Sequence, residues 1–70
     1  MPVQMTIGKV ARQAGVNVQT VRYYERRGLL RPDDYRDSGY RLYTHEAVRR
    51  LRFIKNAQGL GFSLAEVATL

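Results

Sequence analysis

The densest cluster of charged and hydrogen-bonding side chains in the sequence is RYYERR, at residues 22–27. This segment holds three arginines and two tyrosines. An arginine guanidinium makes bidentate hydrogen bonds to phosphate or to the edge of guanine, and a tyrosine hydroxyl donates to phosphate. These residue types therefore indicate binding of a polyanion rather than catalysis, and nucleic acid is the favoured polyanion.

Groups that could support catalysis or hold a metal are sparse. The single histidine, His45, has no cysteine or serine partner nearby, and the chain contains no cysteine. The acids of DDYRD, at residues 33–37, lack a further ligand at a convincing spacing. A solvated turn, or ion pairs with Arg31 and Arg36, is the favoured interpretation of these acids. We expect no enzyme activity, no metal and no cofactor.

The charge and length of the chain also favour a small domain that binds a polyanion. The chain has 70 residues, twelve Lys and Arg against six Asp and Glu, and a net charge of +6. A folded basic domain favours a polyanionic partner, which is nucleic acid before an anionic membrane surface. No stretch approaches the roughly 20 apolar residues that span a bilayer, and no signal peptide is apparent. We expect one cytoplasmic domain without membrane contact.

Helical spacing separates two faces of residues 17–27. At about 3.6 residues per turn, Val18 and Val21 point inward and hold the helix in the domain. The outer flank carries polar side chains at steps of three and four: Gln19, Arg22, Tyr23 and Arg26. A neighbouring stripe adds Thr20, Tyr24 and Arg27. We expect this outer surface to enter the DNA major groove, with its N-terminal end toward the base edges and Tyr24 dividing its area between core and DNA.

This helix is expected to be the second of a helix-turn-helix. Thr6 and Asn17 are N-cap candidates, and apolar residues recur at i, i+3, i+4 and i+7 from Ile7. Gly15 suits a left-handed cap between the two helices, and Gly28 suits the end of the second, with Leu29 folding back on it. Two short helices joined by a tight glycine turn are typical of this motif.

Residues 30–43 predict a small β-hairpin, or wing. Asp37-Ser38-Gly39 is a turn signal, and residues 40–43 alternate as a short strand. An isolated hairpin is marginally stable in water, so we expect it to pack on the helices through Leu30, Leu42 and Tyr43. Tyr40 and Arg41 directly follow the turn and are expected to provide a second DNA contact.

Two further helices complete the predicted fold. Thr44 is the N-cap candidate of a third helix, whose apolar residues recur every three positions and which ends near Gly59 and Gly61. Ser63 and Glu66 form a capping box that opens a fourth helix. Most cations of the third helix are solvated, although Lys55 or Arg52 is expected to reach the DNA backbone near the wing. The predicted class is mainly α with a small β-hairpin, a winged helix-turn-helix with about four helices.

These residues resemble the DNA-binding domain of the MerR family of bacterial transcriptional regulators. The matching motifs are TIGKVARQAGVNVQTVRYYERRGLL, DSGYRLY and AVRRLRFIKNAQGLGFSLAEV. The resemblance implies a winged helix-turn-helix that binds double-stranded promoter DNA through Arg22, Tyr23, Tyr40 and Arg41, with Gln19, Thr20 and Tyr24 as further candidates. It also implies homodimers, joined by a long helix, that distort a promoter spacer so that RNA polymerase can engage it.

The sequence departs from that pattern because it stops at Leu70, before any dimerisation helix or effector segment. We expect either a fragment or a stand-alone variant, monomeric or weakly associating, that binds DNA weakly because the avidity of a dimer is lost. The operator, the inducer and the regulated genes, and whether the outcome is activation or repression, lie outside what the sequence specifies.

Two alternatives to a promoter-binding regulator remain open. One is a small excisionase-like protein that bends DNA for recombination, which direct repeats at an attachment site would distinguish from inverted half-sites at a promoter. The other is a protein-interaction module with an apolar surface made by Phe53, Leu64, Val67 and Leu70. A missing helix packing on that patch is our preferred explanation of it.

Overall fold

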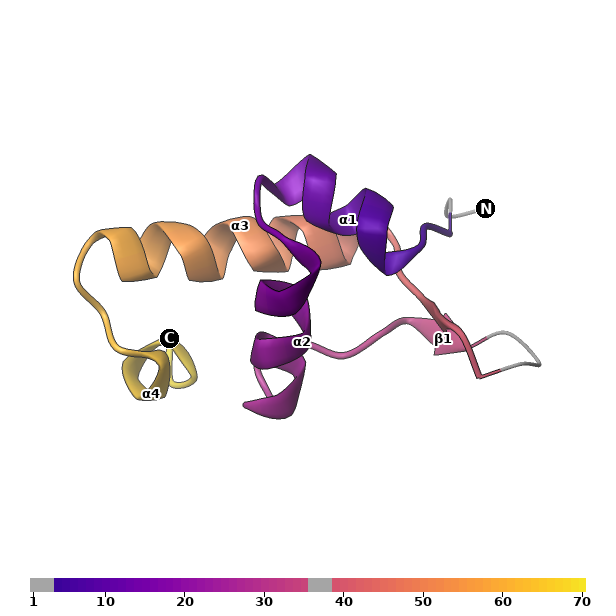
Figure 1. Ribbon diagram of the computed structural model, residues 1–70. Helices are drawn as coiled ribbons and strands as arrows, with labels where there is room; N and C mark the ends of the chain where they lie inside the picture. The colour runs from indigo at the N-terminus through magenta and orange to yellow at the C-terminus, as the bar shows by residue number, and fades with distance from the viewer. Residues whose placement is uncertain (1–3, 36–38) are drawn as a thin grey trace.

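The computed structural model describes residues 4–35 and 39–70, and it confirms a mainly helical fold with a small strand pair (Figure 1). The elements in the described residues are α1 (Ile7–Ala14), α2 (Val18–Arg26), β1 (Asp34–Tyr35), β2 (Arg41–Leu42), α3 (His45–Gly59) and α4 (Leu64–Val67). Figure 1 places the wing and α4 at opposite ends of the molecule, with α2 between them. None of the described helices is both long and apolar enough to cross a membrane.

The predicted N-caps of the first two helices are confirmed. The Thr6 side chain accepts a hydrogen bond from the Lys9 N–H at 3.4 Å. Asn17 Oδ1 accepts from both the N–H and the hydroxyl of Thr20, at 2.8 and 2.9 Å. These bonds satisfy helix-end donors that have no partner inside the helix.

The third helix begins differently from the prediction. Thr44 occupies the N-cap position, but its side chain makes no capping hydrogen bond. Its backbone N–H instead donates to Asp33 Oδ2 at 2.8 Å. Asp33 therefore ties the start of the wing to the start of α3, a role that the sequence interpretation as a solvated turn or an arginine partner did not include.

Left-handed glycines end both helices of the helix-turn-helix, as predicted. Gly15 has φ 73° and Gly28 has φ 74°. At the second site the Leu29 N–H donates to the Tyr24 carbonyl at 2.9 Å and the Gly28 N–H donates to the Glu25 carbonyl at 3.0 Å. This is a Schellman motif, and it turns Leu29 back into the core.

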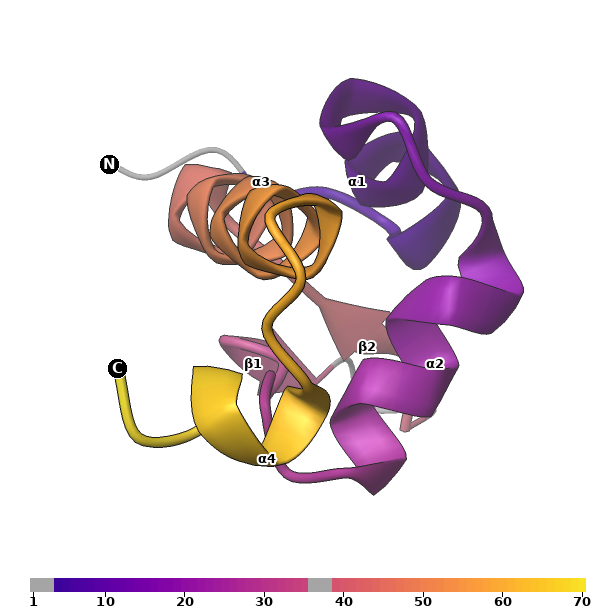
Figure 2. The same cartoon turned by 90° about the vertical axis from the view of Figure 1, so that its left-hand side faces the viewer.

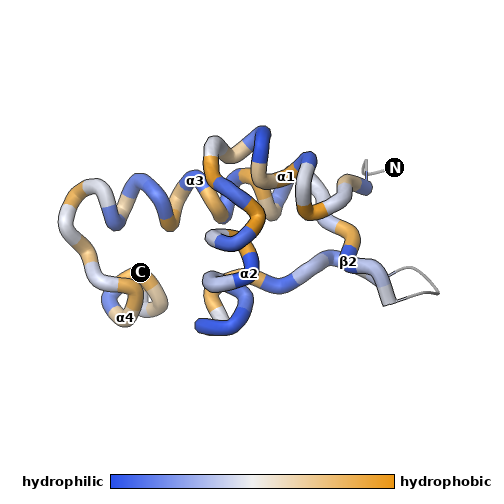
Figure 3. Tube along the Cα trace, in the orientation of Figure 1, coloured by the Kyte–Doolittle hydropathy of each residue, from blue (hydrophilic) through white to orange (hydrophobic). Residues whose placement is uncertain are grey.

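The core lies between α3 and the helices packed around it (Figure 2). Figure 3 shows α3 alternating between hydrophilic and hydrophobic segments along its length. This alternation matches the predicted stripe, whose residues are buried: Val48, Leu51, Ile54 and Ala57. The helix-turn-helix contributes Val10, Ala11, Ala14 and Val21 to the same core.

The second strand of the wing is shorter than predicted, but the wing packs through the expected residues. Its strands pair antiparallel with Asp34 opposite Leu42 and Tyr35 opposite Arg41. Tyr43 leaves the hairpin and pairs with Met5 through hydrogen bonds of 2.6 and 2.9 Å, while Tyr40 precedes β2. Among the wing residues whose burial is described, the buried ones are the three predicted: Leu30, Leu42 and Tyr43. The turn predicted at Asp37 and Ser38, and the pairing of Arg36, fall outside the described residues.

At the C-terminal end, the capping box is confirmed. Ser63 Oγ accepts from the Glu66 N–H at 3.1 Å, and Glu66 Oε1 accepts from the Ser63 N–H at 2.9 Å. These bonds lower the pKa of the Glu66 carboxyl. Val67 is fully buried against the core. The apolar surface predicted to include Val67 is therefore wrong in that residue, although Phe53 and Leu70 are exposed.

Candidate nucleic-acid interface

Helix α2 presents the predicted polar flank to solvent. Val21 is fully buried and Val18 partly buried, so the helix is held by its valines as expected. On the opposite side Gln19, Arg22 and Arg26 are exposed. Thr20 is intermediate, because its hydroxyl is turned toward the Asn17 cap.

Tyr23 organises the cations at the C-terminal end of α2. The guanidinium carbons of Arg26 and Arg27 each lie 5.9 Å from the centre of its ring, a distance typical of cation–π contact. Arg27 also donates from Nη1 to the Tyr23 hydroxyl at 3.1 Å. The ring thus gathers two positive charges on an exposed surface, where an anion could reach them.

Tyr24 faces the other way. Its residue is only 6% exposed, and its hydroxyl donates to Gln58 Oε1 at 2.7 Å. Burial, and then the neighbouring Tyr23, raise its pKa. The expected division of Tyr24 between core and DNA therefore reduces to core packing, because its ring and hydroxyl are both engaged by the protein.

The wing and α2 meet around Arg22. Arg22, Tyr40 and Arg41 line a hollow of about 320 Å³ together with Ile7 and Gly39. A second hollow of about 500 Å³ has Arg22 and Arg41 in its wall as well, with Glu25 and Tyr35. The fold thus brings together three predicted site residues from two segments, and Tyr40 among them is 59% exposed.

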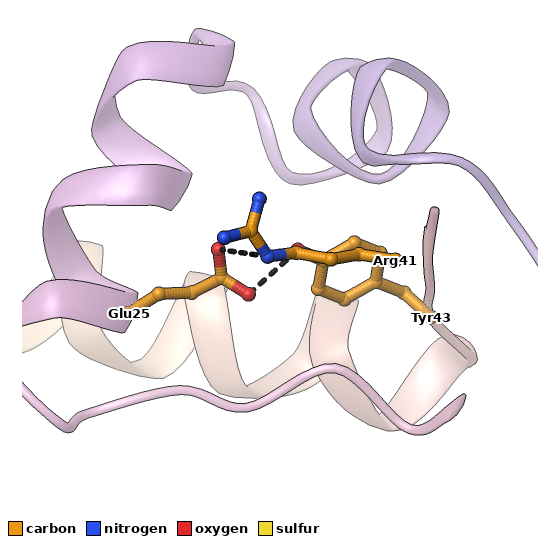
Figure 4. A network of polar contacts seen from close by, with 3 residues as sticks. All are labelled: Glu25, Arg41 and Tyr43. Carbon is orange, nitrogen blue, oxygen red and sulfur yellow. Dashed lines mark hydrogen bonds and ion pairs between the residues drawn. The ribbon is translucent and has the colours of Figure 1, made fainter. Parts of the chain in front are cut away.

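A buried carboxylate connects the wing to α2 (Figure 4). Glu25 Oε2 accepts from the Tyr43 hydroxyl at 2.6 Å, and Glu25 Oε1 lies 3.6 Å from Arg41 Nε. The Glu25 side chain is 10% exposed and that of Arg41 is 48% exposed. Burial and the bond to Glu25 raise the pKa of the Tyr43 hydroxyl far above its ordinary range. The sequence prediction missed Glu25, although its position one turn after Val21 already places it beside the inward face.

The cations of α3 lie elsewhere than predicted. Lys55 Nζ donates to the Gly15 carbonyl at 3.1 Å, and Arg52 Nη2 donates to the Gln13 carbonyl at 2.8 Å. Both contacts are at the turn between α1 and α2, rather than beside the wing. Carbonyls at a helix C-terminus carry partial negative charge and attract cations, which accounts for this placement.

Within residues 4–35 and 39–70, no group of three His, Cys, Asp or Glu side chains is arranged to hold a metal. Of the acids considered as ligands, Asp33 is engaged by the Thr44 N–H and Asp37 lies outside the described residues. The predicted site residues that remain exposed on α2 and the wing are mainly cationic and aromatic.

This arrangement coincides with a family match over nearly the whole chain. Residues 5–70 match the family described as MerR HTH family regulatory protein. The chain belongs to the MerR family. Its resemblance to that family in the motifs of α2, the wing and α3 is thereby confirmed.

MerR-family relatives are regulatory proteins of about twice this length. The mercuric resistance operon regulatory protein of Shigella flexneri is 52% identical over 66 residues, covering 94% of this chain and 46% of that protein. The transcriptional regulator ZntR of Escherichia coli is 41% identical over 64 residues, covering 91% and 45%. The chain therefore spans about half the length of these curated relatives.

Solved MerR-family structures share the fold. A MerR-family transcriptional regulator from Bacillus cereus superposes with a TM-score of 0.87 at 37% identity, covering 96% of this chain and 50% of that one. The regulator HiNmlR, which lacks a sensor domain and was solved bound to promoter DNA, gives a TM-score of 0.87 at 25% identity, covering 96% and 51%.

Proposed function

We propose that residues 1–70 form one domain that binds double-stranded promoter DNA in a sequence-specific manner, as part of a transcriptional regulator. The observation that carries the proposal is the joint surface of Arg22, Tyr40 and Arg41, where α2 and the wing meet. An interface built from a helix and an adjacent hairpin suits a major groove and the backbone beside it. The net charge of +6 favours a polyanionic partner.

In this proposal α2 enters the major groove. Gln19 and Thr20, near its N-terminal end, face base edges. Arg22, Tyr23 and Arg26 contact phosphate or base edges from the exposed flank. Phosphate contacts of this kind position a protein on the duplex, and base contacts specify the sequence.

The wing provides the second contact, to the neighbouring backbone. Tyr40 and Arg41 carry it, because they lie beside Arg22 at the same hollow. Tyr24 is left out of the proposed contact set because its ring is buried and its hydroxyl donates to Gln58. Lys55 is left out because its amine contacts the turn between α1 and α2 and not the wing.

The wider assignments rest on the family. The related HiNmlR bound to promoter DNA supports the same partner class here. We infer that the intact regulator is a cytoplasmic homodimer and that RNA polymerase responds to it indirectly, through the promoter. An excisionase-like role is the second candidate, favoured only by the small size of the basic domain.

The test is selection of bound duplexes from a randomised DNA pool by the purified chain. Enrichment of a defined half-site, single or in inverted pairs, is expected. Enrichment of direct repeats would favour the recombination role. Binding without any enriched sequence would contradict sequence-specific recognition. The Arg22→Ala variant, run beside the wild type, controls for selection of duplexes by the cationic charge of the protein alone.

A further inference from the structure

The carboxylate of Glu25 is nearly buried at its contact with Arg41, but it is not fully hydrogen-bonded. Its Oε1 has no hydrogen-bond partner among the described residues and lies 3.6 Å from the Arg41 Nε. Burying a charged oxygen without full hydrogen bonding costs free energy. A glutamine amide could accept the same hydrogen bond from the Tyr43 hydroxyl without burying a charge, so the bond to Tyr43 does not by itself account for the charge.

The geometry of Arg41 offers a reason for the negative charge of Glu25. Guanidinium has five N–H donors in a fixed plane, and the recorded ion-pair contact with Glu25 is through Nε. Figure 4 shows a terminal nitrogen of Arg41 pointing away from the carboxylate. The side chain is about half exposed and shares its hollow with Arg22 and Tyr40.

We propose that Glu25 is a positioning residue for DNA binding: its carboxylate holds Nε of Arg41 so that the outer guanidinium nitrogens face a backbone phosphate beside Arg22. This inference rests on the proposed DNA-binding function. Tyr43 secures the carboxylate from the other side through Oε2, so that α2, rather than the two-residue strand itself, sets the direction of the wing arginine.

The direction in which Glu25→Gln changes DNA affinity distinguishes a positioning role of Glu25 from a purely electrostatic effect. Glu25→Gln removes a negative charge from a DNA-facing region, which by charge alone tightens DNA binding. If Glu25 positions Arg41, the same change weakens binding, because an ordered contact to phosphate is lost. The amide oxygen of glutamine still accepts from the Tyr43 hydroxyl, so the packing around Tyr43 is kept.

The experiment measures affinity across a salt series for the duplex enriched in the selection and for a mixed-sequence duplex. Glu25→Gln is expected to weaken binding about tenfold, comparable to one charge-assisted hydrogen bond. The slope of log affinity against log salt is expected to fall in size by about one unit, as for one lost phosphate contact. Unchanged or tighter binding would overturn the proposal.

A double-mutant cycle isolates the role of Arg41. In the Arg41→Ala background, Glu25→Gln is expected to leave affinity unchanged or to raise it, since there is no guanidinium left to position. An equal tenfold loss in that background would mean that Glu25 acts through the fold, and would overturn the proposal. Glu46→Gln is the charge-matched control, because Glu46 pairs with Arg49 on α3, and it is expected not to weaken binding.

Arg41→Lys tests the inference without altering the buried carboxylate. Lysine keeps the charge but is a point donor without a planar fork, so it is expected to weaken binding about as much as Glu25→Gln. Binding equal to wild type would contradict positioning. The wild type in the same series tests the proposed function separately, because failure of the wild-type chain to bind either duplex would remove DNA binding itself.

Discussion

Two adjacent tyrosines serve opposite sides of α2. Their ring centres are 6.1 Å apart, yet Tyr23 gathers arginines at the surface while Tyr24 closes the core against Gln58. One residue step turns a side chain by more than a quarter of the helix circumference. Residue type alone therefore does not predict which tyrosine is available to DNA. The angular position of the residue on the helix, relative to the buried Val21, predicts it.

Arg22→Ala is expected to weaken DNA binding for all sequences and to reduce the salt slope by about one unit, if Arg22 contacts phosphate. Filter or fluorescence titrations at several salt concentrations measure both quantities. Arg49→Ala, which removes an exposed cation from α3, is the control. An unchanged slope with altered base preference would instead make Arg22 a reader of base edges.

Tyr43 predicts a loss of stability in alkali. Its pKa is raised in the folded state above the ordinary value of 10.0, first by burial and then by Glu25. The hydroxyl therefore contributes its full stabilisation below pH 10, and loses it as the pH rises from there toward the folded pKa. Urea unfolding at a series of alkaline pH values should show the free energy of unfolding falling more steeply for the wild type than for Tyr43→Phe. Parallel curves would contradict this assignment.

At this scale the sequence predicted the exposed flank of α2 and its valines, because both follow directly from helical spacing. It did not predict Glu25, whose partners Arg41 and Tyr43 lie 16 and 18 residues later in the chain and reach it only once the wing has folded. Nor did it predict the contact of Lys55 with the Gly15 carbonyl, for the same reason. The contacts of long side chains depend on which distant residues the tertiary structure brings within reach.

The ends of the elements depend on backbone conformation that glycine alone adopts readily. Gly28 has φ 74° and Gly8 is helical, and a Cβ at either would meet no atom within 4 Å. Differences between alanine substitutions at the two sites therefore report the backbone and not steric contact.

Gly28→Ala is expected to destabilise the domain by about 1–2 kcal/mol, because an L-residue is strained in the left-handed region. Gly8→Ala is expected to stabilise it by about 0.5–1 kcal/mol, because alanine loses less backbone entropy in a helix. Urea denaturation measures both. A similar effect of the two substitutions would show that the turn after α2 is not held in the left-handed conformation.

Helix α3 contributes to the helix-turn-helix through its cations. Because Lys55 holds the Gly15 carbonyl, Lys55→Ala is expected to lower the free energy of unfolding by about 0.5 kcal/mol and to leave the salt slope of DNA binding unchanged. Thermal unfolding and the salt series test the two parts. A slope reduced by one unit would return Lys55 to the DNA interface.

The existence and order of the elements were predictable, since caps, glycines and apolar spacing are local signals. The bounds of the wing were not. Its strand was expected over residues 40–43, but Tyr43 pairs with Met5, so the alternating pattern covers two different pairings. The side-chain cap predicted at Thr44 is absent, and the contact that the Thr44 N–H makes with Asp33 was not predictable because Asp33 is distant in the chain.

For the whole molecule, binding strength follows from the number of phosphate contacts that one domain can make. A single copy of the domain is expected to bind one half-site no more tightly than about micromolar at physiological salt, because a single copy has no avidity from a second one. Titration of labelled half-site duplex measures this. Nanomolar affinity for one half-site would mean that the single domain is sufficient for tight recognition.

The Met5–Tyr43 pairing has a practical consequence for handling the protein. It holds the start of the described chain at the wing end, while the C-terminus lies at the other end beside α4 (Figure 1). A basic purification tag ahead of the described residues would add its own attraction to the duplex. Labels for the titrations above belong at the C-terminus, where they report on binding without taking part in it.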